Sequence, residues 1–145
     1  MRTLAIAAGA ILTASLAYAH VTVLPRESHA GMDQRYTVRV PTEGQVATTS
    51  VELEVPAGVE VKEVVAGEGY TFDLRREGDR IVAITWKKEI PPKQSAQFEF
   101  IARNPNAAEI AWKARQRFAD GTSADWVGVQ GDRRPASVTR LTAAH

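Results

Sequence analysis

The chain of 145 residues is long enough for one domain with a hydrophobic core of its own. Its 18 Lys and Arg residues nearly balance its 17 Asp and Glu residues, so the sequence offers no basic field that would hold nucleic acid or anionic lipid. It contains no cysteine, which excludes disulfides and leaves packing to stabilise the fold. It also presents no thiol that a redox-active metal could oxidise.

Residues 1–19 have the pattern of a signal peptide. A positively charged start is followed by the mostly apolar run Leu4 to Leu16, and Ala17 and Ala19 form the Ala-x-Ala pattern that signal peptidase recognises. The apolar run is shorter than the ~20 residues that a helix needs to cross a bilayer, which predicts a removable leader instead of an anchor. We therefore expect cleavage between Ala19 and His20 and a periplasmic or secreted protein.

Cleavage there would leave residues 20–145 as the mature chain, which we expect to form a single domain. Removing 19 of the 145 residues leaves 126, and the loss of Arg2 brings basic and acidic residues to 17 each. Short runs of alternating valine and aromatic residues, separated by Pro and Gly, predict an antiparallel β-sandwich. The expected strands contain residues 21–23, 36–40, 51–55, 59–61, 70–74, 82–86 and 98–100.

Three further segments carry weaker patterns. Residues 26–33 are expected to form a loop broken at Gly31, and Ser137 to Leu141 an edge strand. Residues 107–118 contain good helix formers, but strict alternation with cationic residues favours a strand with one solvated face. The residues on its expected inner face are Ile110, Trp112, Ala114, Gln116 and Phe118.

The orientation of Trp126 depends on the turn that precedes it. Asp120-Gly121 is a strong signal for a two-residue hairpin turn. With these two residues at the tip, Trp126 lies opposite Arg115, on the polar face and away from Trp112. A slip of the register by one residue would reverse this orientation.

His20 would become the first residue of the mature chain. Its free α-amine and its imidazole Nδ1 could then close a six-membered chelate ring on one metal ion. Nitrogen ligands in a tetragonal arrangement suit Cu(II), which also heads the affinity order of the divalent first-row ions. The strand that follows would hold this chelate against a sheet edge. The alternative is an exposed histidine without a role, as we expect for His29 and His145.

Glu43 is a candidate for a further ligand because it follows Pro41 at the end of an expected strand. Such a residue is, taken alone, more often part of a turn. Glu52 and Glu54 alternate with core residues and belong to a solvated face. The sequence shows no nucleophilic triad, catalytic carboxylate pair or phosphate-binding glycine loop, so its motifs do not indicate an enzyme.

The mature chain carries an ordered series of short motifs. They are Ala19-His20-Val21-Thr22-Val23 with Pro25, Tyr36 to Glu43, Val51 to Val59, Ile84-Thr85-Trp86, Ile90-Pro91-Pro92, Arg103-Asn104-Pro105, Trp112-Lys113, Gln116, Asp120-Gly121 and Trp126. This series resembles the YcnI-like copper-binding domain family, and the resemblance covers essentially the whole mature chain.

The resemblance implies a secreted β-sandwich, cupredoxin- or immunoglobulin-like, that binds Cu(II) through a single-histidine brace. By position, His20 would supply the amine and imidazole nitrogens, Glu43 a carboxylate ligand, and Trp126 an indole beside the copper. Members often carry a His-Pro-Ala-Pro segment near the end, whereas this chain has Arg134-Pro135-Ala136-Ser137. Many also continue into a membrane anchor or a second copper-chaperone domain, which we expect to be lacking here.

We therefore expect a Cu(II)-binding protein that serves copper trafficking or homeostasis without catalytic turnover. The expected partners are the copper ion and another periplasmic copper chaperone or a membrane copper transporter, with no nucleic acid. Two alternatives stay open. A copper-dependent oxidase or monooxygenase would need a second brace histidine, and an adhesion or scaffold module would use no metal.

Overall fold

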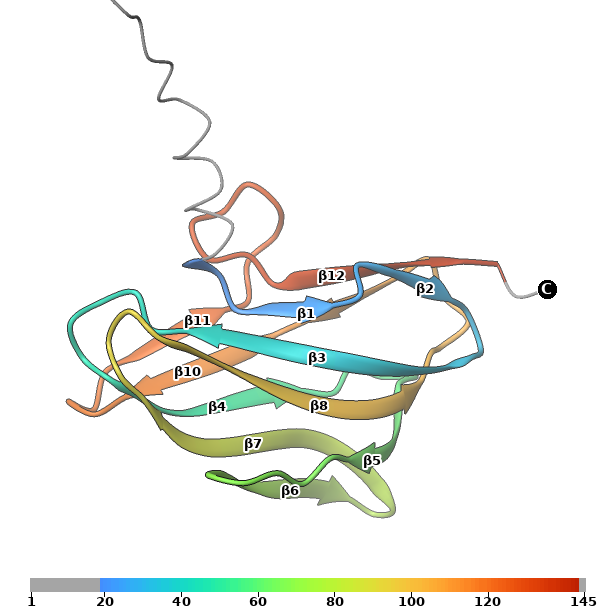
Figure 1. The fold of residues 1–145 in the computed structure, drawn as a ribbon. Helices are drawn as coiled ribbons and strands as arrows, with labels where there is room; N and C mark the ends of the chain where they lie inside the picture. Colours follow the sequence, from blue (N-terminus) through green and yellow to red (C-terminus); the bar gives the residue numbers. More distant parts are fainter. Residues whose placement is uncertain (1–18, 144–145) are drawn as a thin grey trace, which may run out of the picture.

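The structure, a computed structural model, describes residues 19–143, which form a β-sandwich (Figure 1). The signal peptide expected over residues 1–19 lies outside the described residues apart from Ala19, and His145 also lies outside them. Between residues 19 and 143, no helix has the length and apolar character needed to cross a membrane.

Two antiparallel sheets face each other in the sandwich (Figure 1). The first has the strand order β1 (Thr22–Leu24), β3 (Asp33–Pro41), β8 (Ser95–Arg103) and β5 (Glu60–Val64). The second has the order β11 (Ser123–Trp126), β10 (Ala114–Phe118), β4 (Thr48–Glu54), β7 (Arg80–Ile90) and β6 (Thr71–Glu77). A third sheet joins β2 (Glu27–His29), β12 (Ser137–Thr142) and β9 (Glu109–Trp112), and its central strand β12 also contacts β1.

The hydrophobic core lies between the two main sheets. Alternate residues of each strand turn inward because successive side chains of a strand point to opposite faces. Val38 and Val40 of β3 and Leu53 of β4 are fully buried. The indole of Trp86 on β7 stacks on the ring of Phe98 on β8, with 5.3 Å between the ring centroids, so the sheets are joined by aromatic contacts. The antiparallel β-sandwich predicted from the alternation is confirmed.

The third sheet corrects two expectations. Residues 26–33 are not only a loop, because Glu27–His29 form β2 parallel to β12. The strand expected from Ser137 to Leu141 is not an edge strand, since it forms β12, which lies between β2 and β9. Both differences result from pairing between the two ends of the described chain. A strand of three residues carries too little alternation to predict such a pairing.

The strand expected within residues 107–118 is present but divided. The chain leaves β9 at Trp112 and enters β10 at Ala114, and the buried positions continue in the same parity across the break. β9 pairs with β12, whereas β10 pairs with β4 and β11. The chain therefore passes from one sheet to another at Lys113, whose carbonyl still accepts a hydrogen bond of 2.9 Å from the Glu54 N–H.

The predicted register of the hairpin between β10 and β11 is wrong by one residue. Trp126 pairs with Ala114, and Arg115 pairs with Asp125. This shift moves Trp126 from the polar face to the buried face, where it is 8% exposed.

The cause of the shift is a turn that is one residue longer than expected. The Phe118 N–H donates to the Thr122 carbonyl at 2.9 Å, so residues 119–121 form a three-residue loop. Gly121 has a φ of +88°, the left-handed conformation that such a loop requires at its last position. The Asp120 Oδ1 accepts hydrogen bonds from the hydroxyl and N–H of Thr122, and these bonds lower the pKa of the Asp120 carboxyl.

Candidate metal centre

His20 lies two residues before the start of β1 and is partly buried. The residues that follow it are anchored firmly, since Val21 and Val23 are 2% and 1% exposed. β1 pairs with β3 so that Thr22 faces Arg39. Continuing this antiparallel register places His20 level with Pro41, two residues before Glu43. The pairing of β1 with β3 therefore brings the candidate ligands to the same end of the sheet.

The other side of β1 is held by side chains of β12. The Ser137 hydroxyl accepts a hydrogen bond of 2.9 Å from the Val23 N–H, and the Thr139 hydroxyl donates to the Pro25 carbonyl at 2.9 Å. The Thr139 oxygen also accepts a hydrogen bond from Trp112 Nε1 at 3.0 Å. β1 is thus fixed on both edges, which limits the movement of His20 at its start.

The imidazole of His20 lies against the indole of Trp126. Their ring centroids are 5.4 Å apart, and the ring planes are inclined by 51°. The indole N–H donates to Gln116 Oε1 at 3.1 Å, so it is engaged in the interior of the protein. The contact with His20 is therefore made by the ring system of Trp126, and its N–H is used to hold the indole in place.

Gln116 is the centre of a buried hydrogen-bond network. Its amide nitrogen donates to the Pro41 carbonyl and to the Thr48 hydroxyl, both at 2.8 Å. The Thr48 and Thr42 hydroxyls are 2.7 Å apart, and the Thr42 hydroxyl donates to the Ile90 carbonyl at 2.9 Å. Since Thr42 uses its proton on this carbonyl, Thr48 is the donor between the two hydroxyls. The network connects Trp126 to residues on both sides of the loop that carries Glu43, through the carbonyl of Pro41 and the hydroxyl of Thr48.

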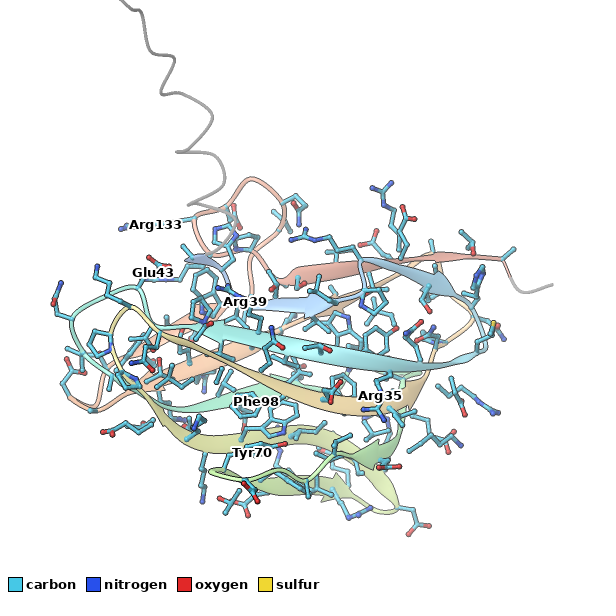
Figure 2. All side chains as sticks on the ribbon, in the orientation of Figure 1. Arg35, Arg39, Glu43, Tyr70, Phe98 and Arg133 are labelled. Carbon is cyan, nitrogen blue, oxygen red and sulfur yellow. The ribbon has the colours of Figure 1, made fainter. Side chains whose placement is uncertain are left out.

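One cavity of about 520 Å³ brings the three predicted site residues together. His20, Glu43 and Trp126 all line it, and so do Arg133 and Arg134 from the segment between β11 and β12. Figure 2 shows Glu43 and Arg133 at the end of the molecule where β1 begins. The described part of the chain contains no hydrogen bond or ion pair of the Glu43 carboxylate, which leaves its oxygens available to a ligand.

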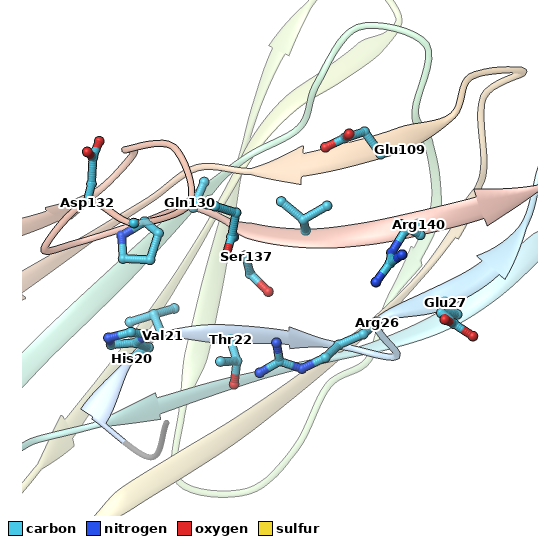
Figure 3. A pocket seen from close by; sticks show the side chains of 14 residues that line it. His20, Val21, Thr22, Arg26, Glu27, Glu109, Gln130, Asp132, Ser137 and Arg140 are labelled. Atoms are coloured by element: carbon cyan, nitrogen blue, oxygen red, sulfur yellow. The ribbon is translucent and has the colours of Figure 1, made fainter. Parts of the chain in front are cut away.

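A second cavity of about 730 Å³ also reaches His20. It lies between β1 and β12, with Thr22 and Ser137 on facing walls and Arg26 and Arg140 further along (Figure 3). His20 therefore stands where two cavities meet.

The described side chains alone do not complete a metal site. Among residues 19–143, no group of three or more His, Cys, Asp or Glu side chains is arranged to hold a metal ion. His20 and Glu43 would supply one nitrogen and one oxygen. The remaining nitrogen would have to come from the His20 backbone, which becomes a free amine only when the bond to Ala19 is cut.

His29 lies in β2 instead of a loop, and its Nδ1 is 2.7 Å from the Thr142 hydroxyl. It does not line either cavity beside His20. The parity of Gln116 with Trp112 predicts that it faces inward, but no pattern in the sequence marks it as part of the site. For Arg133 and Arg134 no local pattern gave a signal.

Fold and site together define an immunoglobulin-like β-sandwich with a histidine held beside a tryptophan where the first strand begins. The chain is similar to a protein from Nocardia farcinica whose crystal structure revealed an immunoglobulin-like fold, with 25% identity and a TM-score of 0.72 over 84% of this chain and 97% of that chain. A non-cellulosomal cohesin from Archaeoglobus fulgidus is similar in fold, with 17% identity and a TM-score of 0.51 over 85% of this chain and 90% of the cohesin.

The chain belongs to the family described as a domain of unknown function, DUF1775, which matches residues 20–141. It is 38% identical over 132 residues to the copper-binding protein CutI of Bacillus subtilis (strain 168). That match covers 88% of this chain, and the chain spans 65% of the length of the relative. These matches confirm the resemblance to the YcnI-like family.

Proposed function

We propose that this protein binds Cu(II) through His20 once the signal peptide has been removed, with Glu43 as a carboxylate ligand. The observation that carries the proposal is the place of His20. It lies two residues before β1, the centroid of its imidazole is 5.4 Å from that of the Trp126 ring, and it shares a cavity with Glu43. The name of the Bacillus subtilis relative, a copper-binding protein, supports copper as the metal.

The proposed ligands suit the cupric ion. The α-amine and Nδ1 of His20 give two nitrogens in one chelate ring, and Glu43 adds an oxygen. Imidazole and carboxylate ligands favour Cu(II), whereas Cu(I) is selected by thiolates and thioethers. The sequence has no cysteine. Of its two methionines, Met1 belongs to the expected leader and Met32 does not line the cavity.

Trp126 would limit access to the metal. Because Gln116 holds its N–H, the indole stays in one orientation, and its ring system covers one side of His20. A bulky ring at this place slows the exchange of ligands and the approach of a reductant on that side.

In the cell the protein would carry copper in the periplasm or outside the cell, in trafficking or homeostasis. Its copper ion would be cargo that passes to or from a periplasmic chaperone or a membrane transporter. The relatives reported above support a binding protein and not an enzyme. Acidification would release the ion because protons compete for the amine and the imidazole.

The proposal is tested by comparing two forms of the protein, one starting at His20 and one starting at Ala19. In the second form an amide replaces the amine, so we expect Cu(II) affinity to fall by at least about tenfold in a competition titration with a chromophoric chelator. His29→Ala in the His20 form is the matched control and should keep the full affinity. Equal affinity of the two forms would contradict the proposal.

A further inference from the structure

Two arginines share the cavity with His20 and Glu43. Arg133 and Arg134 both line it and both are exposed. Neither guanidinium has a hydrogen bond or ion pair with any described residue. A bound cupric ion would add two positive charges to those of the arginines, against the single negative charge of Glu43. The loaded cavity would therefore carry a net positive charge that favours an anion.

The segment that carries the arginines has a defined conformation. The Gly128 N–H donates to the Arg134 carbonyl at 3.0 Å, and the Ala136 N–H donates to the Gly128 carbonyl at 2.8 Å. At the tip of this segment, the Asp132 N–H donates to the Val129 carbonyl at 3.0 Å, and the Asp132 carboxylate accepts a hydrogen bond from the Val129 N–H, also at 3.0 Å. These bonds close residues 128–136 into a loop that begins two residues after Trp126. The loop therefore keeps both arginine positions beside the cavity.

The other walls of the cavity are largely apolar. They include Pro41, Val46, Phe118, Ala124 and the ring of Trp126. The volume of about 520 Å³ falls within the range of about 300–1,000 Å³ that is usual for small-molecule sites. Apolar walls disfavour a strongly hydrated inorganic anion and favour one with a carbon body.

We infer that this cavity binds a small organic carboxylate, which bridges the metal and the arginines. The inference rests on the proposed function, since one carboxylate oxygen would serve as a further ligand of the Cu(II) that His20 and Glu43 would hold. The other oxygen accepts charge-assisted hydrogen bonds from Arg133 or Arg134, whose planar guanidinium groups match carboxylates. The protein then takes up and releases copper as a ternary complex with the anion.

The first arm of the test uses the protein that starts at His20, loaded with one equivalent of Cu(II). Isobutyrate is the probe, because a monocarboxylate chelates copper too weakly in solution to extract it. We expect isobutyrate to change the EPR spectrum of the bound ion in a saturable manner. Phosphate should have no such effect at the same concentration.

The second arm uses the double variant Arg133→Gln/Arg134→Gln. We expect the midpoint of the isobutyrate titration to rise by about fivefold to tenfold, since partly exposed guanidinium–carboxylate contacts are lost. Arg76→Gln is the control. It makes the same replacement of Arg by Gln at one position on β6, which lies on the far side of the sandwich from β1 (Figure 1), and it should keep the wild-type midpoint.

The possible results separate the two proposals. If His20-started protein does not bind Cu(II), the proposed function falls and this inference with it. If Cu(II) binds but isobutyrate leaves its spectrum unchanged, or acts equally on the double variant, only the carboxylate site is overturned. Equal action of phosphate and isobutyrate would overturn the assignment to an organic carboxylate.

Discussion

The interior of the site depends on the side-chain amide of Gln116. It accepts from Trp126 and donates to Pro41 and Thr48, and it is 2% exposed. A buried polar group that loses its partner costs the free energy of its desolvation. The orientation of the indole and the start of the Glu43 loop therefore depend on one side chain.

Replacing Gln116 by Leu should lower the free energy of unfolding by about 2–3 kcal/mol, because it leaves the Trp126 N–H and the Pro41 carbonyl without partners. Urea denaturation measures this change. In a Trp126→Phe background the same substitution should cost about 1 kcal/mol less, because Phe has no N–H to satisfy. If the two substitutions changed the free energy of unfolding additively, the hydrogen bond between Trp126 and Gln116 would contribute no coupling energy.

Trp126 should report the binding of copper. A cupric ion held by His20 lies close to its indole, so stoichiometric Cu(II) should quench most of the fluorescence of Trp126, and Trp126→Phe should lose that response. Trp86→Phe is the control, since Trp86 is fully buried between the sheets and its Nε1 has no hydrogen-bond partner within the described residues. Undiminished quenching in Trp126→Phe would place the metal elsewhere.

At the scale of elements, the hairpin of β10 and β11 decides where Trp126 points. Gly121→Ala forces a side chain onto a residue with a φ of +88° and should destabilise the protein by about 1 kcal/mol in urea denaturation. Gly44→Ala is the control, because no positive φ is required there and nothing lies within 4 Å of an added Cβ. If both substitutions had the same effect, the turn geometry would not be the cause.

Alternation predicted the strands better than their register and partners. It gave the inward positions of 107–118 correctly through the break at Lys113. It did not give the face of Trp126, because Asp-Gly is compatible with turns of two or three residues. The length of the turn decides which face of the sheet each residue of the following strand occupies. It missed β2, where only Ser28 of three residues is buried.

At the scale of the whole molecule, a second buried network joins β3 to the third sheet. The Tyr36 hydroxyl donates to Asn104 Oδ1, and Asn104 Nδ2 donates to the Ser28 hydroxyl at 2.9 Å and to the His29 carbonyl at 2.8 Å. Burial raises the pKa of Tyr36 from 10.0 to about 12. This network lies away from His20, so it supports the fold and not the site.

The raised pKa of Tyr36 predicts a loss of stability in alkali. Below pH 10 the hydroxyl is protonated in both states, whereas between pH 10 and about 12 it ionises first in the unfolded chain. The free energy of unfolding should therefore fall with rising pH in this window, as measured by urea denaturation. Tyr36→Phe should be less stable at neutral pH, because Asn104 loses a donor, but should show a shallower alkaline decline. Equal slopes would contradict the assignment to Tyr36.

The candidate site could be predicted only in its chain-local parts. His20 follows from the cleavage pattern, whereas Glu43 was assigned as a ligand through the resemblance, since its place after a strand is more often that of a turn residue. The arginines on the loop of residues 128–136 and the amide of Gln116 join the cavity through pairing between distant strands, which no local pattern encodes. The resemblance implies that Trp126 lies beside the copper site at His20. The turn pattern predicts Trp126 on the polar face, whereas in the structure Trp126 contacts His20 from the buried face.

The central claim is that one processed histidine holds a cupric ion by two nitrogens. EPR of the Cu(II) complex, made with protein that starts at His20, tests it most directly. We expect hyperfine structure from two nitrogen ligands, an altered spectrum when Ala19 is retained, and a smaller change in Glu43→Gln. A spectrum that is identical with and without Ala19 would contradict the account.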